Sequence, residues 1–80
     1  MKEIEVIASY NLKGYIKPHR FRLTTEDESL LVVNIDRILF SEKDRKGETI
    51  KYRCECVMHQ RKKYVDIYFY RDKMKWCLKM

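Results

Sequence analysis

From about Thr49 to Met80 the chain alternates apolar and charged residues with a period of two. Successive side chains of a β-strand point to opposite faces, so this alternation is typical of strands with one face buried and the other in water. The pattern therefore predicts a sheet whose basic residues are arrayed on one surface. It does not by itself identify a function.

The length of 80 residues limits the chain to one core. A chain of this size buries only about 60% of the surface that its unfolded form exposes, so its core is a single compact unit. With 45% apolar residues, two glycines and one proline, the composition is that of a folded chain. We expect one domain over residues 1–80.

The N-terminal part predicts a hairpin. Apolar residues at alternate positions over 4–10 indicate a half-buried strand, and a second strand is expected over 16–23. The turn residues Asn11–Gly14 lie between them. Because Pro18 cannot donate a ladder hydrogen bond, the second strand should be at an edge there or begin after it.

The segment Leu30–Phe40 is apolar at both parities apart from Asn34, Asp36 and Arg37. This pattern fits either a long central strand covered on both sides or a helix. Its many β-branched residues favour the strand, and the polar cluster at 34–37 is expected to mark a bend or bulge. An acidic loop is expected before this segment, at about residues 24–29.

Three further strands are expected over 50–59, 64–70 and 74–80. Six short strands without a convincing helix or βαβ spacing predict an all-β fold. We expect a small antiparallel barrel or sandwich-like meander of SH3-like or Sm-like size. The side chains predicted to face its core in the last three strands are Ile50, Tyr52, Cys54, Cys56, Met58, Val65, Ile67, Phe69, Met74, Trp76, Leu78 and Met80.

The excess of positive charge is confined to the C-terminal half. Residues 1–40 hold six Lys/Arg and six Asp/Glu, whereas residues 41–80 hold twelve and six. The net charge of +6 therefore belongs to the second half and favours a polyanionic partner.

Tyrosines on the predicted fifth strand lie among these cations. Aromatic rings on a sheet stack bases while neighbouring cations neutralise phosphates. The same rings also fit cross-strand stabilisation, or burial by a second copy or another partner, and Asp66 among them opposes a polyanion. The residues predicted to bind nucleic acid are Lys51, Arg53, Arg61, Lys62, Lys63 and Lys75 for phosphates, and Tyr64, Tyr68 and Tyr70 for stacking.

Three cysteines raise the question of a metal or catalytic site. Zinc sites usually place two residues between paired cysteines, whereas Cys54 and Cys56 are separated by one and share the core parity, so packing explains them. Cys77 alternates with lysines and is a candidate reactive thiol, although an edge cysteine without a role is the simpler interpretation. An odd number of cysteines fits no closed disulfide framework and agrees with a reducing compartment.

The sequence contains no glycine-rich phosphate loop and no nucleophile elbow. We therefore expect no catalytic residues, no metal and no cofactor; a thiol-dependent enzyme or metal site is the third alternative. The acids within Met1–Glu5 differ from a signal peptide, and no apolar run is long enough for a membrane span, so we expect a cytoplasmic protein.

With the strands assigned, one pattern of hydrophobic and turn positions covers most of the chain. It consists of Val6-Ile7-Ala8-x-Tyr10-x-x-x-Gly14-x-Ile16-x-Pro18-x-x-Phe21-Arg22, Ile35-Asp36-Arg37-Ile38, Tyr52-x-Cys54 and Trp76. With this pattern the chain resembles a group of short, functionally uncharacterised single-domain proteins of Gram-positive bacteria. The resemblance implies a stand-alone intracellular domain and lends no catalytic residues.

Our leading hypothesis is a non-enzymatic module that binds RNA or single-stranded DNA through the basic face of the last three strands. The alternative is a protein-interaction module or homodimer in which the tyrosines or the apolar Leu30–Phe40 strand are buried by a partner chain.

Overall fold

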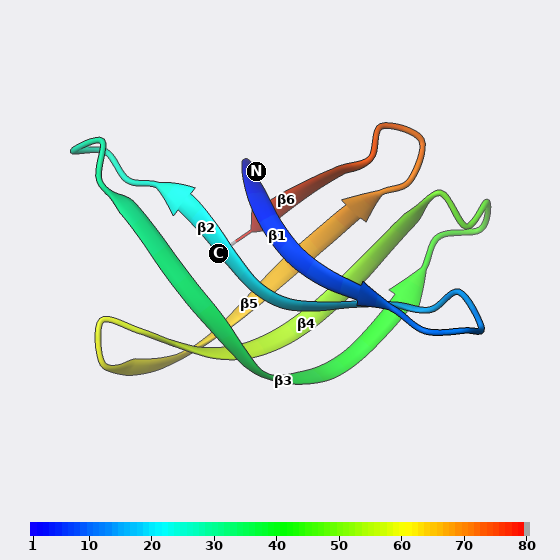
Figure 1. The fold of residues 1–80 in the computed structure, drawn as a ribbon, viewed down its shortest axis with the longest axis horizontal. Coiled ribbons are helices and arrows are strands. Elements are labelled where there is room, and N and C mark those ends of the chain that lie inside the picture. The colour runs from blue at the N-terminus through cyan, green and yellow to red at the C-terminus, as the bar shows by residue number, and fades with distance from the viewer. Residues whose placement is uncertain (80) are drawn as a thin grey trace.

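Each strand pairs with the next one along the chain, and the last strand returns to pair with the first, in a computed structural model that describes residues 1–79 (Figure 1). All pairs are antiparallel and the sheet closes into a barrel. The predicted all-β meander is therefore confirmed. The strands are β1 (Lys2–Tyr10), β2 (Ile16–Thr24), β3 (Leu30–Lys43), β4 (Thr49–Met58), β5 (Arg61–Tyr70) and β6 (Lys75–Lys79).

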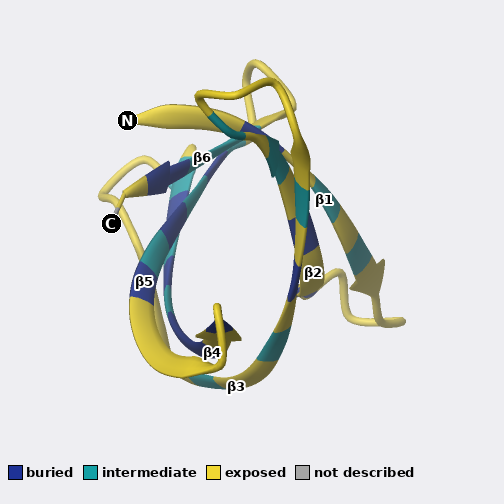
Figure 2. Cartoon of the chain, turned by 90° about the vertical axis from the view of Figure 1, so that its left-hand side faces the viewer, coloured by how far each residue is buried: buried dark blue, intermediate teal, exposed yellow. Residues whose placement is uncertain are grey.

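Two strands bend and belong to both sides of the barrel. Residues 2–4 of β1 pair with β6, whereas residues 5–10 pair with β2. In the same way, residues 30–34 of β3 pair with β2, and residues 35–43 pair with β4. β1 and β3 thus connect β2 on one side to β4, β5 and β6 on the other, as the end-on view shows (Figure 2).

The bend of β3 lies where the polar cluster predicted it. The register with β4 shifts between Ile35 and Arg37 and again between Ile38 and Phe40. The segment is a strand, so the helix alternative is wrong. The expected cover on both sides is also wrong, because Leu30 and Val32 remain 65% and 57% exposed. A closed single-layer barrel buries only its inner face, and the outer face of β3 has no second layer above it.

Pro18 lies beside a bulge in β2. Ile7 of β1 is opposite Arg20 and Ala8 is opposite Pro18, which leaves His19 as the extra residue. The ladder between β2 and β3 begins only at Arg20, so Pro18 lies outside it. The predicted edge position is confirmed, and the missing N–H interrupts no bond between β2 and β3.

The core is built from the inward side chains of all six strands. Trp76 packs against Phe69 and Tyr52, with ring centroids 4.6 and 5.8 Å apart. Met74, predicted to face the core, instead lies exposed in the β5–β6 turn, where its φ of 53° ends the turn before β6 begins. Met80 is outside the described residues. The buried apolar residues are Ile4, Ile16, Phe21, Val33, Ile50, Tyr52, Cys54, Cys56, Met58, Val65, Ile67, Phe69 and Leu78.

One buried hydroxyl ties two strands of the barrel together. Tyr52 on β4 donates a hydrogen bond of 2.7 Å to the carbonyl oxygen of Ile16 on β2. Burial raises the pKa of this tyrosine, so it stays a neutral donor. β2 and β4 are not neighbours in the sheet, so the bond spans the core.

Replacing Tyr52 by Phe should therefore destabilise the fold. The carbonyl oxygen of Ile16 would lose its partner, which costs about 1–3 kcal/mol in the free energy of unfolding. Urea denaturation followed by circular dichroism measures this loss. Tyr10→Phe, at an exposed ring, is the matched control. Equal denaturation midpoints for the two variants would contradict this role of the hydroxyl.

Candidate nucleic-acid interface

The register of β4, β5 and β6 places most of the predicted nucleic-acid residues on one outer face. Lys51 lies opposite Tyr68, and Tyr70 lies opposite Lys75. The rings of Tyr68 and Tyr70 stack on each other, with centroids 6.4 Å apart and planes inclined by 18°. Each tyrosine thus has a lysine opposite it on one adjacent strand, and the other neighbours are Cys77 for Tyr68 and Thr49 for Tyr70.

Arg61 and Lys63 are not on this face. They have the parity of Val65, which is buried, so their side chains leave the opposite side of β5. Both are nevertheless exposed, because the β4–β5 hairpin extends beyond the core at its tip (Figure 2). The structure thus divides the predicted set into an outer face and a hairpin tip.

Four of the six predicted phosphate ligands form ion pairs with carboxylates of neighbouring strands. The sequence alone could not show this, because each acid becomes a neighbour only through the strand register. The nitrogen–oxygen distances are 3.8 Å for Lys51–Glu42, 3.0 Å for Arg53–Asp66, 3.5 Å for Lys62–Glu55 and 3.2 Å for Lys75–Glu3.

These ion pairs differ in how far they are exposed. The side chains of Lys62 and Lys75 are 61% and 58% exposed, whereas those of Lys51 and Arg53 are 30% and 39% exposed. An ion pair exposed at both members, as Lys75–Glu3 is, contributes at most about 1 kcal/mol, so its cation exchanges partners readily, whereas the Glu55 side chain that pairs with Lys62 is only 11% exposed. Arg53 is held more firmly, since its ion pair is itself a hydrogen bond of 3.0 Å to Asp66, whose side chain is only 15% exposed.

Glu55 is a buried carboxylate on the outer side of the sheet. Only 8% of the residue is exposed, although its parity predicts a solvent-facing position. Arg37 on β3 and Lys62 on β5 lie within ion-pair distance, and the Tyr64 hydroxyl donates a hydrogen bond of 3.2 Å to it. Tyr64 is therefore tied to the sheet, and in the stacked pair the Tyr70 hydroxyl donates a hydrogen bond of 3.8 Å to the Met1 sulfur.

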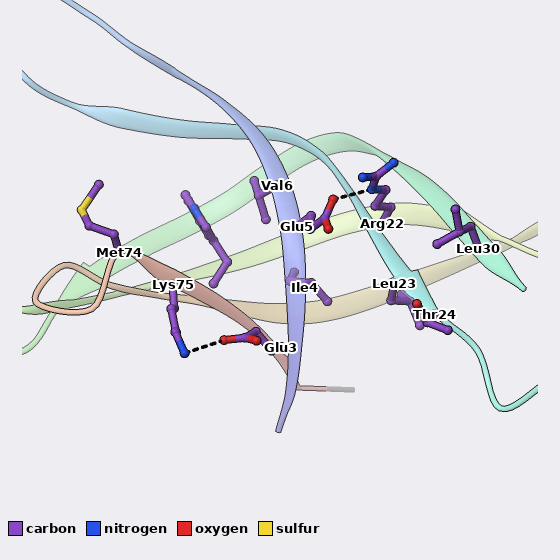
Figure 3. Close-up of a pocket in the computed structure, with 11 residues that line it drawn as sticks. Glu3, Ile4, Glu5, Val6, Arg22, Leu23, Thr24, Leu30, Met74 and Lys75 are labelled. Atoms are coloured by element: carbon purple, nitrogen blue, oxygen red, sulfur yellow. Dashed lines mark hydrogen bonds and ion pairs between the residues drawn. The ribbon is translucent and has the colours of Figure 1, made fainter. Parts of the chain in front are cut away.

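A cavity of about 490 Å³ lies where β1 passes from β6 to β2. Figure 3 shows the two ion pairs beside it, Glu3 with Lys75 and Glu5 with Arg22, the latter at 2.5 Å. Apolar side chains such as Ile4 complete its lining. Both carboxylates already contact cations, so the charges lining the cavity balance each other. Among the described residues, the cavity therefore has no cluster of unpaired charged groups that would bind a ligand.

The fold brings Ser9 and His19 into hydrogen-bond contact, which the sequence alone could not predict. The hydroxyl oxygen of Ser9 lies 2.7 Å from Nε2 of His19, across the β1–β2 bulge. Both side chains are exposed, and within residues 1–79 no hydrogen bond joins a carboxylate to His19. The contact is thus a surface hydrogen bond without the carboxylate that orients a catalytic histidine.

The cysteines divide as their parities predicted. Cys54 and Cys56 are fully buried in the core, which confirms the packing interpretation, and burial raises the pKa of both thiols, that of Cys54 to about 12. Cys77 is partly exposed on the outer face. In the described part of the chain, no group of three His, Cys, Asp or Glu residues is arranged to hold a metal ion.

No protein-family model, curated protein or solved structure matches the chain. The resemblance to short proteins of Gram-positive bacteria stays a prediction. Over residues 1–79, no helix has the length and apolar character needed to cross a membrane.

Alkylation of the native protein should distinguish the three thiols. Iodoacetamide is expected to label Cys77 and to leave Cys54 and Cys56 unmodified, because thiolates react and burial suppresses ionisation of the two core thiols. Mass spectrometry of proteolytic peptides measures the labelling at each site. In denaturant all three should react, and rapid native labelling of Cys54 would contradict its burial.

Proposed function

We propose that the protein is a non-enzymatic module that binds single-stranded RNA or DNA on the outer face of β4, β5 and β6. The observation that carries this proposal is the stacked pair Tyr68–Tyr70 with Lys51 and Lys75 opposite its rings. Aromatic rings stack on bases of any sequence, and cations beside them neutralise the phosphates that join those bases.

The exposure of the ion pairs assigns separate roles to the predicted cations. Lys75 contacts a phosphate, because both members of its pair with Glu3 are exposed and the carboxylate is exchanged for a phosphate at little cost. Lys62, whose side chain is also exposed, contacts a phosphate while it keeps the buried Glu55 as its partner. Arg53 instead stabilises the sheet through Asp66. Arg61 and Lys63 add positive charge at the hairpin tip, which attracts a polyanion without touching the stacked bases.

A reducing cytoplasm suits this role. Three free cysteines persist there, two of them in the core, where oxidation would disturb packing. The net charge of +6 also favours an acidic partner such as nucleic acid.

Fluorescence anisotropy of labelled single-stranded RNA and DNA tests the phosphate contacts. The variant Lys62→Glu/Lys75→Glu should bind more weakly. It should also reduce the magnitude of the negative slope of log K against log salt by about 1.4, since each lost contact to a single strand removes about 0.7. The control Lys13→Glu/Lys46→Glu makes the same change of charge in the β1–β2 and β3–β4 loops. Equal losses of affinity in both variants would show that binding depends on net charge alone and would contradict the proposed face.

The stacking contact has its own test. Tyr68→Ala should raise Kd by roughly five- to 150-fold, because loss of one base stack costs about 1–3 kcal/mol. Tyr15→Ala, at an exposed ring in the β1–β2 turn, should leave Kd unchanged. Failure of the unmodified protein to bind either strand at low salt, where non-specific cationic contacts are strongest, would rule out the proposal.

A further inference from the structure

The first part of β3 has an open edge. Residues 30–34 pair with β2 on one side, and β4 becomes the neighbour on the other side only from Ile35 onward. Over residues 1–79, no ladder pairs the second edge of this segment. Its backbone N–H and C=O groups on that side are therefore free to pair with another strand.

This open edge is also apolar. Leu30, Leu31, Val32 and Val33 follow one another, and the side chains of Leu30 and Val32 are exposed on the outer face. Proteins often protect such an edge with lysine or proline, and neither occurs within residues 30–33. An exposed apolar edge of this kind marks a surface for strand addition.

Two clusters of opposite charge lie at the same end of the barrel (Figure 1). One is the acidic loop 25–29 between β2 and β3, with Glu26, Asp27 and Glu28. The other is the tip of the β4–β5 hairpin, with Arg61 and Lys63. In the described part of the chain, no ion pair joins the two clusters or neutralises either one.

We propose that the occupant of this edge is a second copy of the chain. The two β3 strands pair antiparallel about a two-fold axis near Val32, which makes one sheet continuous across the dimer. Because β4 occupies the edge from Ile35 onward, the partner chain must leave the edge at that point. The segment that leaves is the one preceding the partner's residue 30, which is its acidic loop.

The geometry directs this acidic loop toward the hairpin tip of the first copy. The tip continues β4 and β5 beyond the position where β4 separates from β3, on the side that faces the open edge. Arg61 and Lys63 extend from the inner side of β5 there, without a carboxylate partner within residues 1–79. The two-fold axis repeats the contact, so each acidic loop meets one basic tip.

This arrangement explains why a copy fits better than an unrelated strand. An isologous interface requires one surface to carry both halves of each complementary contact. The apolar edge of β3 pairs with the same edge of the second copy, and one end of each barrel holds both the acidic and the basic cluster. An unrelated partner would have to reproduce this charge pattern independently.

Size-exclusion chromatography with light scattering over a range of concentrations tests the edge. The unmodified protein should form a dimer, and Leu30→Lys should raise the dimer Kd by roughly tenfold or more, since it sets a charge within the apolar contact. Leu12→Lys makes the same replacement at an exposed leucine in the β1–β2 turn and should dimerise normally. Thermal melting should show both variants folded.

Charge reversal tests the second contact. Glu26→Lys/Glu28→Lys and Arg61→Glu/Lys63→Glu should each weaken self-association, because like charges then meet at both copies of the contact. An equal mixture of the two variants should recover the dimer, since every loop again faces a tip of opposite charge. Recovery in the mixture supports the proposed pairing, and its absence overturns it. A monomeric unmodified protein at 100 µM, on the order of the concentrations at which weak dimers form, also overturns it.

Discussion

The bend of β3 is the constraint on which the rest of the structure depends. A strand of 14 residues cannot stay in one flat sheet and also close a six-stranded barrel, so it changes neighbours from β2 to β4 at Ile35. The register shifts beyond that point provide the curvature. The same change of neighbour leaves the edge of 30–34 open, so closure of the barrel and exposure of an apolar edge have one cause.

On the outer face of the barrel, the strand register places carboxylates beside cations and so reduces the positive charge available to a polyanion. The second half of the chain carries the whole excess of cations, yet several of them lie beside carboxylates from another strand. The electrostatic attraction for a polyanion therefore depends on exposed pairs such as Lys75–Glu3 and on the cations of the hairpin tip. Buried Glu55 has the opposite effect, because it ties Tyr64 and two cations to the sheet.

Some predictions failed where neighbouring elements override the local pattern. Parity correctly predicted that Cys54 and Cys56 are buried, since alternation along a strand is local. Met74 has core parity but lies in a turn, because the chain reverses one residue later than the pattern indicates. Arg61 and Lys63 were grouped with outward lysines because a run of charge has no visible parity, and only the β4–β5 register separates them.

The strand pattern, the turns and the edge position of Pro18 could be predicted from sequence, because each follows from backbone chemistry or from alternation within a few residues. The partners of each charged side chain could not, because Glu3 meets Lys75 only when β1 closes against β6. The open edge of β3 likewise results from which strand runs beside it, and that depends on the curvature of the whole barrel. Contacts between residues far apart in the chain form only when the sheet closes, so tertiary structure alone decided both candidate surfaces.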